Sequence, residues 1–127
     1  MNPAGGSLLD RDGREADLVS NFDPEVTYED SDLPDHIGET YHGRQGVVRA
    51  TERWGEPFEE MTVDLVRIVG TGDCLVSIHR WRARARHTGI AFDEPLAIVW
   101  KFRDRKVIHF RSFRDPDEAL EAAGLSE

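Results

Sequence analysis

A carboxylate at the end of a strand-like segment is the side chain best placed for acid–base chemistry in this sequence. Residues 26–30 alternate between apolar and polar types, as the residues of a half-buried strand do, and they end on Asp30. A carboxylate that faces an apolar pocket is a stronger base than one in water, so Asp30 could take a proton from a substrate near neutral pH. The alternative is an Asp30 that points to solvent or caps the following loop.

The segment 75–87 could place a second titratable group opposite Asp30. The register of this segment decides whether that group is His79 or Arg80. One set of alternate residues contains His79, and the other contains four arginines that begin at Arg80. We expect the arginines to face outward, where they can pair with acidic neighbours such as Asp64 or Glu60, and His79 to face inward. A slip of one residue would bring Arg80 into the pocket instead. A buried, hydrogen-bonded histidine with a purely structural role is the alternative for His79.

Aromatic and apolar residues that share strand or helix faces with these groups could line a small-molecule pocket. The expected lining is Tyr28, Trp54, Trp81, Ile98, Trp100, Phe110 and Ser112. The hydroxyl of Tyr28 could bind a substrate oxygen, although a tyrosine at such a position more often packs its ring and sends its hydroxyl to water. For the whole set, the alternative is that the rings fill the core and leave no cavity.

Periodicity and turn signals mark the elements that must position these residues. The strongest helix prediction covers 44–58, where one stripe recurs at helical spacing and consists of Val47, Thr51, Trp54 and Phe58. Strands are predicted at 26–30, 61–69, 75–87, 90–103 and 107–114. The short turns between the last four strands favour antiparallel hairpins, and helices followed by a long meander indicate an α+β fold.

Weaker signals mark a flexible tail at 1–8, a short charged helix over 9–22, a turn at Asp23-Pro24 and a loop at 31–38. A last short helix is predicted from Asp115 as N-cap, Pro116 at the first helical position and Glu118 as capping-box partner. The length of 127 residues fits one domain, which we place at 9–127.

Composition excludes several classes of function. The net charge of −9 argues against general nucleic-acid binding, which needs clustered basic residues. No apolar run has the length of a membrane span, and the N-terminus lacks the basic start of a secretory signal, so we expect a cytoplasmic protein. Cys74 is the only cysteine, and neither His36 nor His42 has partners at metal-ligand spacing. We therefore predict no metal and no cofactor.

Three segments of the sequence carry a resemblance to a known superfamily: FDPEVTYEDS at 22–31, GETYHGRQGV at 38–47 and LAIVWKFRDRKVIHFRSFRDPDEALEAAGL at 96–125. They resemble the SnoaL-like branch of the nuclear-transport-factor-2-like superfamily, which includes ketosteroid isomerase, limonene epoxide hydrolase and polyketide cyclases. The resemblance implies a cystatin-like α+β barrel, with a cone-shaped, curved antiparallel or mixed sheet wrapped around helices. It also implies a homodimer, but one fold carries many functions. The rarity of lysine beside common arginine is typical of high-GC bacteria, and the expected apolar lining suits a small hydrophobic molecule.

Residue by residue, the resemblance to ketosteroid isomerase is partial. Asp30 aligns with the aspartate that shuttles the proton in that enzyme. The tyrosine of its oxyanion hole would fall in the Gly-rich tail, where no tyrosine precedes Tyr28, and its protonated aspartate aligns with Ile98. The loss of these donors argues against steroid isomerisation. An inward Arg80 beside Asp30 would be similar to the epoxide hydrolases, yet no second aspartate completes their triad.

Two functions follow from these observations. The first is a cofactor-free isomerase, cyclase or hydrolase on a small apolar substrate, with Asp30 as general base and His79 as a second catalytic group. The second is a ligand-binding or dimerisation domain of the same fold without catalysis.

Overall fold

The computed structural model describes residues 21–30 and 40–125. The predicted tail at 1–8, the predicted loop at 31–38 and all but the end of the helical pattern at 9–22 lie outside these residues. Phe22, at the end of that pattern, is not helical and begins a strand. Within the described part, neither helix has the length and apolar character needed to cross a bilayer.

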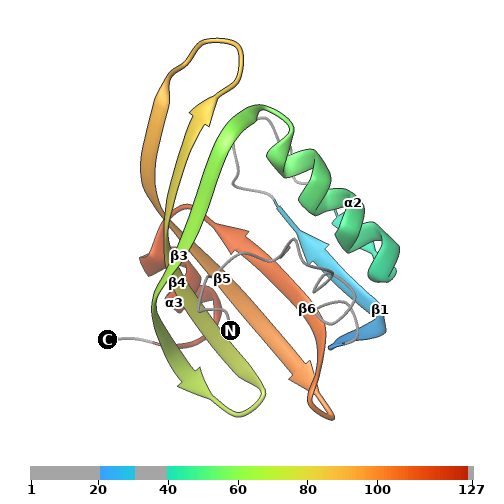
Figure 1. Cartoon of the computed structure of the whole chain (residues 1–127). Coiled ribbons are helices and arrows are strands. Elements are labelled where there is room, and N and C mark those ends of the chain that lie inside the picture. The colour runs from blue at the N-terminus through green and yellow to red at the C-terminus, as the bar shows by residue number, and fades with distance from the viewer. Residues whose placement is uncertain (1–20, 31–39, 126–127) are drawn as a thin grey trace.

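Six strands form one mixed sheet in the order β2-β1-β6-β5-β4-β3 (Figure 1). They are β1 (Phe22–Glu29), β2 (Thr40–His42), β3 (Phe58–Thr71), β4 (Cys74–Ala85), β5 (Ala91–Arg103) and β6 (Lys106–Phe113). β1 runs parallel to β6, and every other neighbouring pair is antiparallel. The predicted α+β fold with a curved sheet is confirmed, although β2 and β3 are free edges and the sheet is not closed into a barrel.

The turn predicted at Asp23-Pro24 is wrong, because both residues lie inside β1. The pairing of β1 with β6 shifts between Phe22 and Thr27, so the proline sits in an irregular stretch of the ladder. Such a position tolerates a residue that has no backbone N–H to donate. The local turn signal was therefore overridden by sheet pairing.

The helix α2 (Gly43–Gly55) ends three residues before the predicted boundary. Phe58 starts β3 instead of completing the helical stripe, because Gly55 and Pro57 interrupt the helix before it. The second helix, α3 (Pro116–Ala122), begins as predicted: the side chain of Asp115 accepts a hydrogen bond from the backbone N–H of Asp117 at 2.9 Å.

The two helices cover opposite faces of the sheet. α2 contributes Val47 and Ala50 to a buried cluster with Ile98 and Phe110, on what we call the inner face. α3 packs its Leu120 on the other side, the outer face, with Val76, Ile78, Ala97, Val99, Phe113 and Ala119. A third cluster, around Trp81, lies on the inner face at the far ends of β3, β4 and β5. Association as a homodimer stays a prediction.

The hairpin between β3 and β4 depends on Gly70. Its φ of +98° is one that side chains rarely adopt, and an added Cβ would lie 2.8 Å from the Cys74 carbonyl oxygen and 2.9 Å from Leu125 Cδ1. We expect Gly70→Ala to lower the free energy of unfolding by about 2–3 kcal/mol in urea denaturation, from strain and overlap together. Gly72→Ala is the matched control: its φ is +73° with no atom within 4 Å, so a loss near 1 kcal/mol is expected. Equal losses in the two variants would contradict the role of the overlap.

Candidate functional site

β4 places His79 on the inner face and Arg80 on the outer face. His79 is 6% exposed, whereas the side chain of Arg80 is 56% exposed. The Arg80 guanidinium donates to both carboxylate oxygens of Asp93, at 2.8 and 2.5 Å, and this hydrogen bonding lowers the pKa of the Asp93 carboxyl. The alternative register, with Arg80 in the pocket and beside Asp30, is therefore wrong.

A ladder of stacked rings crosses four neighbouring strands on the inner face. Trp100 of β5 stacks on Phe110 of β6 with ring centroids 4.9 Å apart, and Phe110 stacks on Tyr28 of β1 at 4.5 Å. Tyr41 of β2 continues the ladder at 6.0 Å from Tyr28. Tyr41 was not predicted as a site residue, although it lies within the segment GETYHGRQGV at 38–47 that carries the family resemblance. The ladder belongs to the apolar cluster that packs under α2. The predicted pocket residues Tyr28, Trp100 and Phe110 are therefore packed against one another within this cluster.

The Tyr28 hydroxyl is turned into the protein and lies 2.8 Å from the Ser112 hydroxyl. The expected contact with water is therefore wrong for this side chain, which is 7% exposed. Burial is the main cause that raises the pKa of Tyr28, and the nearby charge of Asp30 raises it further. Tyr28 is thus a neutral phenol throughout the physiological pH range, and its hydroxyl is held by Ser112.

Asp30 lies at the end of β1 and is 1% exposed. The parallel register pairs Glu29 with Arg111, so the next step along both strands brings Asp30 beside Ser112. Its alternation with Glu29 turns it to the same face as Tyr28. The alternative of an Asp30 in bulk water is therefore wrong, and the carboxylate belongs to the inner face.

His79 is the end of a chain of three hydrogen-bonded side chains. Its Nε2 lies 2.8 Å from the Ser77 hydroxyl, and Trp100 Nε1–H donates to the same hydroxyl oxygen at 2.7 Å. Burial lowers the pKa of His79, so its ring is neutral near pH 7. Ser77 was not predicted, although it shares the phase of His79 on β4 and could have been found from that alternation.

The indole of Trp81 is surrounded by other rings. Trp54 of α2 and Phe92 of β5 stack on it with centroids 6.1 and 5.8 Å away, and Phe58 meets it edge-on at 5.2 Å. The two apolar clusters of the inner face are separated by a row of buried polar residues, which we call the polar row: Asp30, Ser112, Ser77 and His79. Ile98 interrupts this row, because it pairs with Ser77 on one side and Ser112 on the other.

A model of the SnoaL-like domain matches residues 10–110 of the chain, which is most of its length. The chain belongs to the SnoaL-like domain family. No protein of curated function matches the sequence.

Solved structures support the fold of this SnoaL-like domain. A hypothetical protein of ketosteroid-isomerase-like fold from Catenulispora acidiphila, in complex with trimethylamine, is 20% identical with a TM-score of 0.67, over 86% of this chain and 81% of that one. An NTF2-like protein from Burkholderia thailandensis is 25% identical with a TM-score of 0.68, over 87% and 85%. TerC, co-crystallised with polyporic acid, is 17% identical with a TM-score of 0.65, over 84% and 82%.

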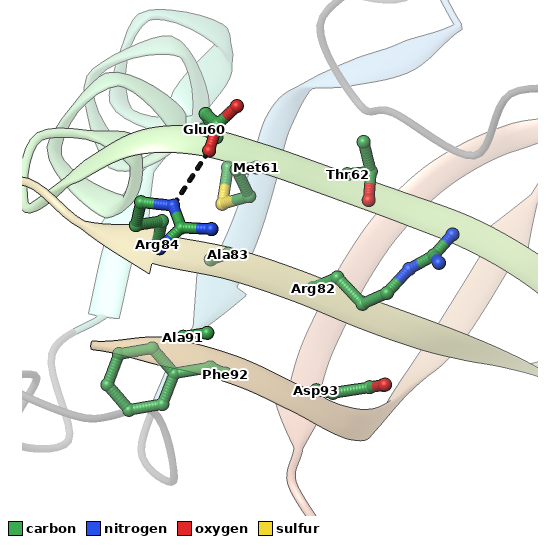
Figure 2. A pocket seen from close by; sticks show the side chains of 9 residues that line it. All are labelled: Glu60, Met61, Thr62, Arg82, Ala83, Arg84, Ala91, Phe92 and Asp93. Carbon is green, nitrogen blue, oxygen red and sulfur yellow. Dashed lines mark hydrogen bonds and ion pairs between the residues drawn. The ribbon is translucent and has the colours of Figure 1, made fainter. Parts of the chain in front are cut away.

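The outer face of the SnoaL-like domain carries the expected ion pairs. Arg82 lies 2.7 Å from Asp64, and Arg84 lies 3.0 Å from Glu60. Glu60, Arg82 and Arg84 also border an open groove of about 500 Å³, whose other lining residues are Met61, Thr62, Ala83, Ala91, Phe92 and Asp93 (Figure 2). None of these residues was assigned to the predicted pocket. The groove is therefore a surface feature of the β3, β4 and β5 ends, distinct from the polar row.

The burial of the His79 imidazole predicts that the stability of the protein depends on pH. The unfolded chain binds a proton on His79 near the ordinary pKa of about 6.5, whereas the folded chain binds it only at lower pH. The free energy of unfolding should therefore fall as the pH drops below about 6.5, by at most about 1.4 kcal/mol per pH unit for each such histidine. Burial also lowers the pKa of His109, which contributes in the same direction.

Urea denaturation between about pH 5.5 and pH 7.5 measures this slope. His79→Gln should make the slope shallower, because it removes one of these two contributions. A slope that is the same in His79→Gln and the unmutated protein would show that His79 titrates alike in both states.

Proposed function

We propose that this SnoaL-like domain binds a small apolar molecule at the inner face of its sheet and that Asp30 acts there as a general base. The observation that carries the proposal is the burial of the Asp30 carboxylate, which is 1% exposed at the end of β1. Natural proteins rarely bury a carboxylate without a structural or chemical reason, because desolvation of the charge is costly. Proton transfer is a chemical reason of this kind.

The reaction class that fits this base is abstraction of a proton next to a carbonyl group, as isomerases and cyclases require. A carboxylate held at a fixed position beside a substrate can accept such a proton as a general base. Tyr28 and Ser112 supply hydroxyls beside Asp30, and His79 is a second proton-transfer group on the polar row. Ile98 replaces the acidic donor of the ketosteroid isomerases, so we do not extend the proposal to steroids.

Two solved structures of similar fold contain small molecules, which favours a small ligand for this domain as well. One was solved with trimethylamine and another, TerC, with polyporic acid. The second candidate function is ligand binding or dimerisation without catalysis. It is favoured by the packed ring ladder, which fills the inner face under α2.

Exchange of ketone α-hydrogens for deuterium separates the two functions. Purified protein is incubated in D₂O with a panel of small aromatic and alicyclic ketones, and NMR follows the loss of the α-proton signals. We expect exchange above the buffer rate for at least one apolar ketone. Binding of panel members without any exchange would favour the non-catalytic function.

A further inference from the structure

Two buried nitrogen atoms on β4 have no hydrogen-bond partner among the described residues. They are Nδ1 of His79 and Nε1 of Trp81, on side chains that are 6% and 5% exposed. The two residues are two positions apart on one strand, so their side chains leave the sheet on the same, inner face. Buried polar atoms in native proteins nearly always have partners, so each of these atoms calls for one.

Trp81 Nε1 can only donate a hydrogen bond, because the indole nitrogen has no free lone pair. The ring is held in place by Trp54, Phe58 and Phe92, which pack around it from α2, β3 and β5. These neighbours are apolar over the surfaces that contact the indole. A partner for the N–H must therefore bring an acceptor atom into apolar surroundings.

The hydrogen bonds from Trp100 to Ser77 and from Ser77 to His79 determine which ring nitrogen of His79 carries the hydrogen. Trp100 Nε1 is also a donor only, and it occupies one lone pair of the Ser77 oxygen. The Ser77 hydroxyl hydrogen is satisfied if it is donated to His79 Nε2, 2.8 Å away. The neutral ring then carries its own hydrogen on Nδ1. In the other tautomer both neighbours would donate to Ser77, and the described residues offer its hydroxyl hydrogen no acceptor.

We propose that His79 Nδ1–H and Trp81 Nε1–H form a donor pair for the carbonyl oxygen of a small apolar ligand. Ser77 and Trp100 are positioning residues, which hold His79 in the tautomer that donates. Both donors are neutral, so the pair suits an uncharged carbonyl or the enolate derived from it better than a dianion. The proposal rests on the ligand site of the proposed function but does not require Asp30 to be catalytic.

Two probes of the same shape test the donor pair: 2-acetylnaphthalene and 2-isopropenylnaphthalene, in which a C=CH₂ group replaces the C=O. Titrations are followed by the indole N–H signals in ¹H–¹⁵N NMR. We expect the ketone to bind about tenfold more tightly than the alkene and to shift the Trp81 signal downfield. Equal affinities, no binding of the ketone, or an unmoved Trp81 signal would each overturn the proposal.

Matched variants locate the effect. Trp81→Phe should remove most of the preference for the ketone, whereas Trp54→Phe, which removes a neighbouring indole N–H, should change both affinities alike and keep their ratio. A preference that survives in a folded Trp81→Phe protein would exclude Trp81 as a donor.

The positioning role of Ser77 has a readout that needs no ligand. Long-range ¹H–¹⁵N correlations distinguish the two imidazole tautomers, and we expect the Nδ1–H form in the unmutated protein. Ser77→Ala should shift His79 toward the other tautomer and reduce the ketone preference, and Ser77→Thr should restore both. An Nε2–H tautomer of His79 in the unmutated protein would overturn the positioning role of Ser77. A ketone preference in a protein that exchanges no α-protons would leave the donor pair intact and refute only the base assignment.

Discussion

Asp30→Asn is expected to lower the rate of ketone α-proton exchange by at least about 100-fold, because an amide cannot accept the proton that the carboxylate takes. The substitution keeps the shape of a side chain that is 1% exposed, so the packing around it is preserved. The rate constants come from the same NMR experiment in D₂O, on the ketone that the unmutated protein exchanges fastest. Circular dichroism and the melting temperature establish that the variant is folded.

Glu29→Gln is the control for the loss of a carboxylate. Glu29 precedes Asp30 directly but faces the outer side of β1, where it contacts His109 at 3.4 Å and Arg111 at 3.9 Å. We expect its exchange rate to stay within about twofold of that of the unmutated protein, since the affected group lies on the opposite face. Full exchange activity in a folded Asp30→Asn protein would refute Asp30 as the base.

Phe110→Ala is expected to lower the free energy of unfolding by about 3–5 kcal/mol. Phe110 is 1% exposed and lies at the centre of the ring ladder, with Tyr28 and Trp100 stacked on it and Phe22 at 5.5 Å. Its removal leaves a cavity that three large rings border, and rings held by neighbouring strands cannot move far to fill it. Urea denaturation monitored by tryptophan fluorescence measures the loss.

Phe102→Ala provides the comparison within the same strand pair. Phe102 is only partly buried and packs at the margin of this cluster, so less than half of the loss is expected. If the two variants lose the same stability, Phe110 is not the centre of the core. A loss at Phe110 of less than about 1 kcal/mol would indicate room beneath α2 and would favour a cavity there.

Patterns within single segments predicted much of this fold. The alternation of arginines along β4 placed His79 on the inner face and the arginines outside, because a strand turns successive side chains to opposite faces. The same reasoning anticipated Asp64 and Glu60 as partners of these arginines, and the structure pairs Arg82 with Asp64 and Arg84 with Glu60. The turns between later strands predicted their antiparallel hairpins, and Asp115 marked the start of α3.

The pairing of distant segments could not be predicted in this way. No local pattern indicates that β1 runs parallel to β6, or that Tyr28 bonds to Ser112, which is 84 residues away. The hydrogen bond from Trp100 to Ser77 and the stacking of Tyr41 on Tyr28 were missed for the same reason, since each joins two different strands. Pro24 shows the converse, because a strong turn signal was overridden by the pairing of β1.

The amino-acid sequence by itself determined which residues face together along each strand and helix, since side-chain direction follows from the local backbone period. Only the tertiary structure decided which of these faces meet. The strand order brings Asp30 beside Ser112 and places Trp100, Ser77 and His79 in one hydrogen-bonded chain. Strand order is set by the packing of the whole chain around its core. The neighbours that make up the candidate site could therefore be identified only in the folded sheet.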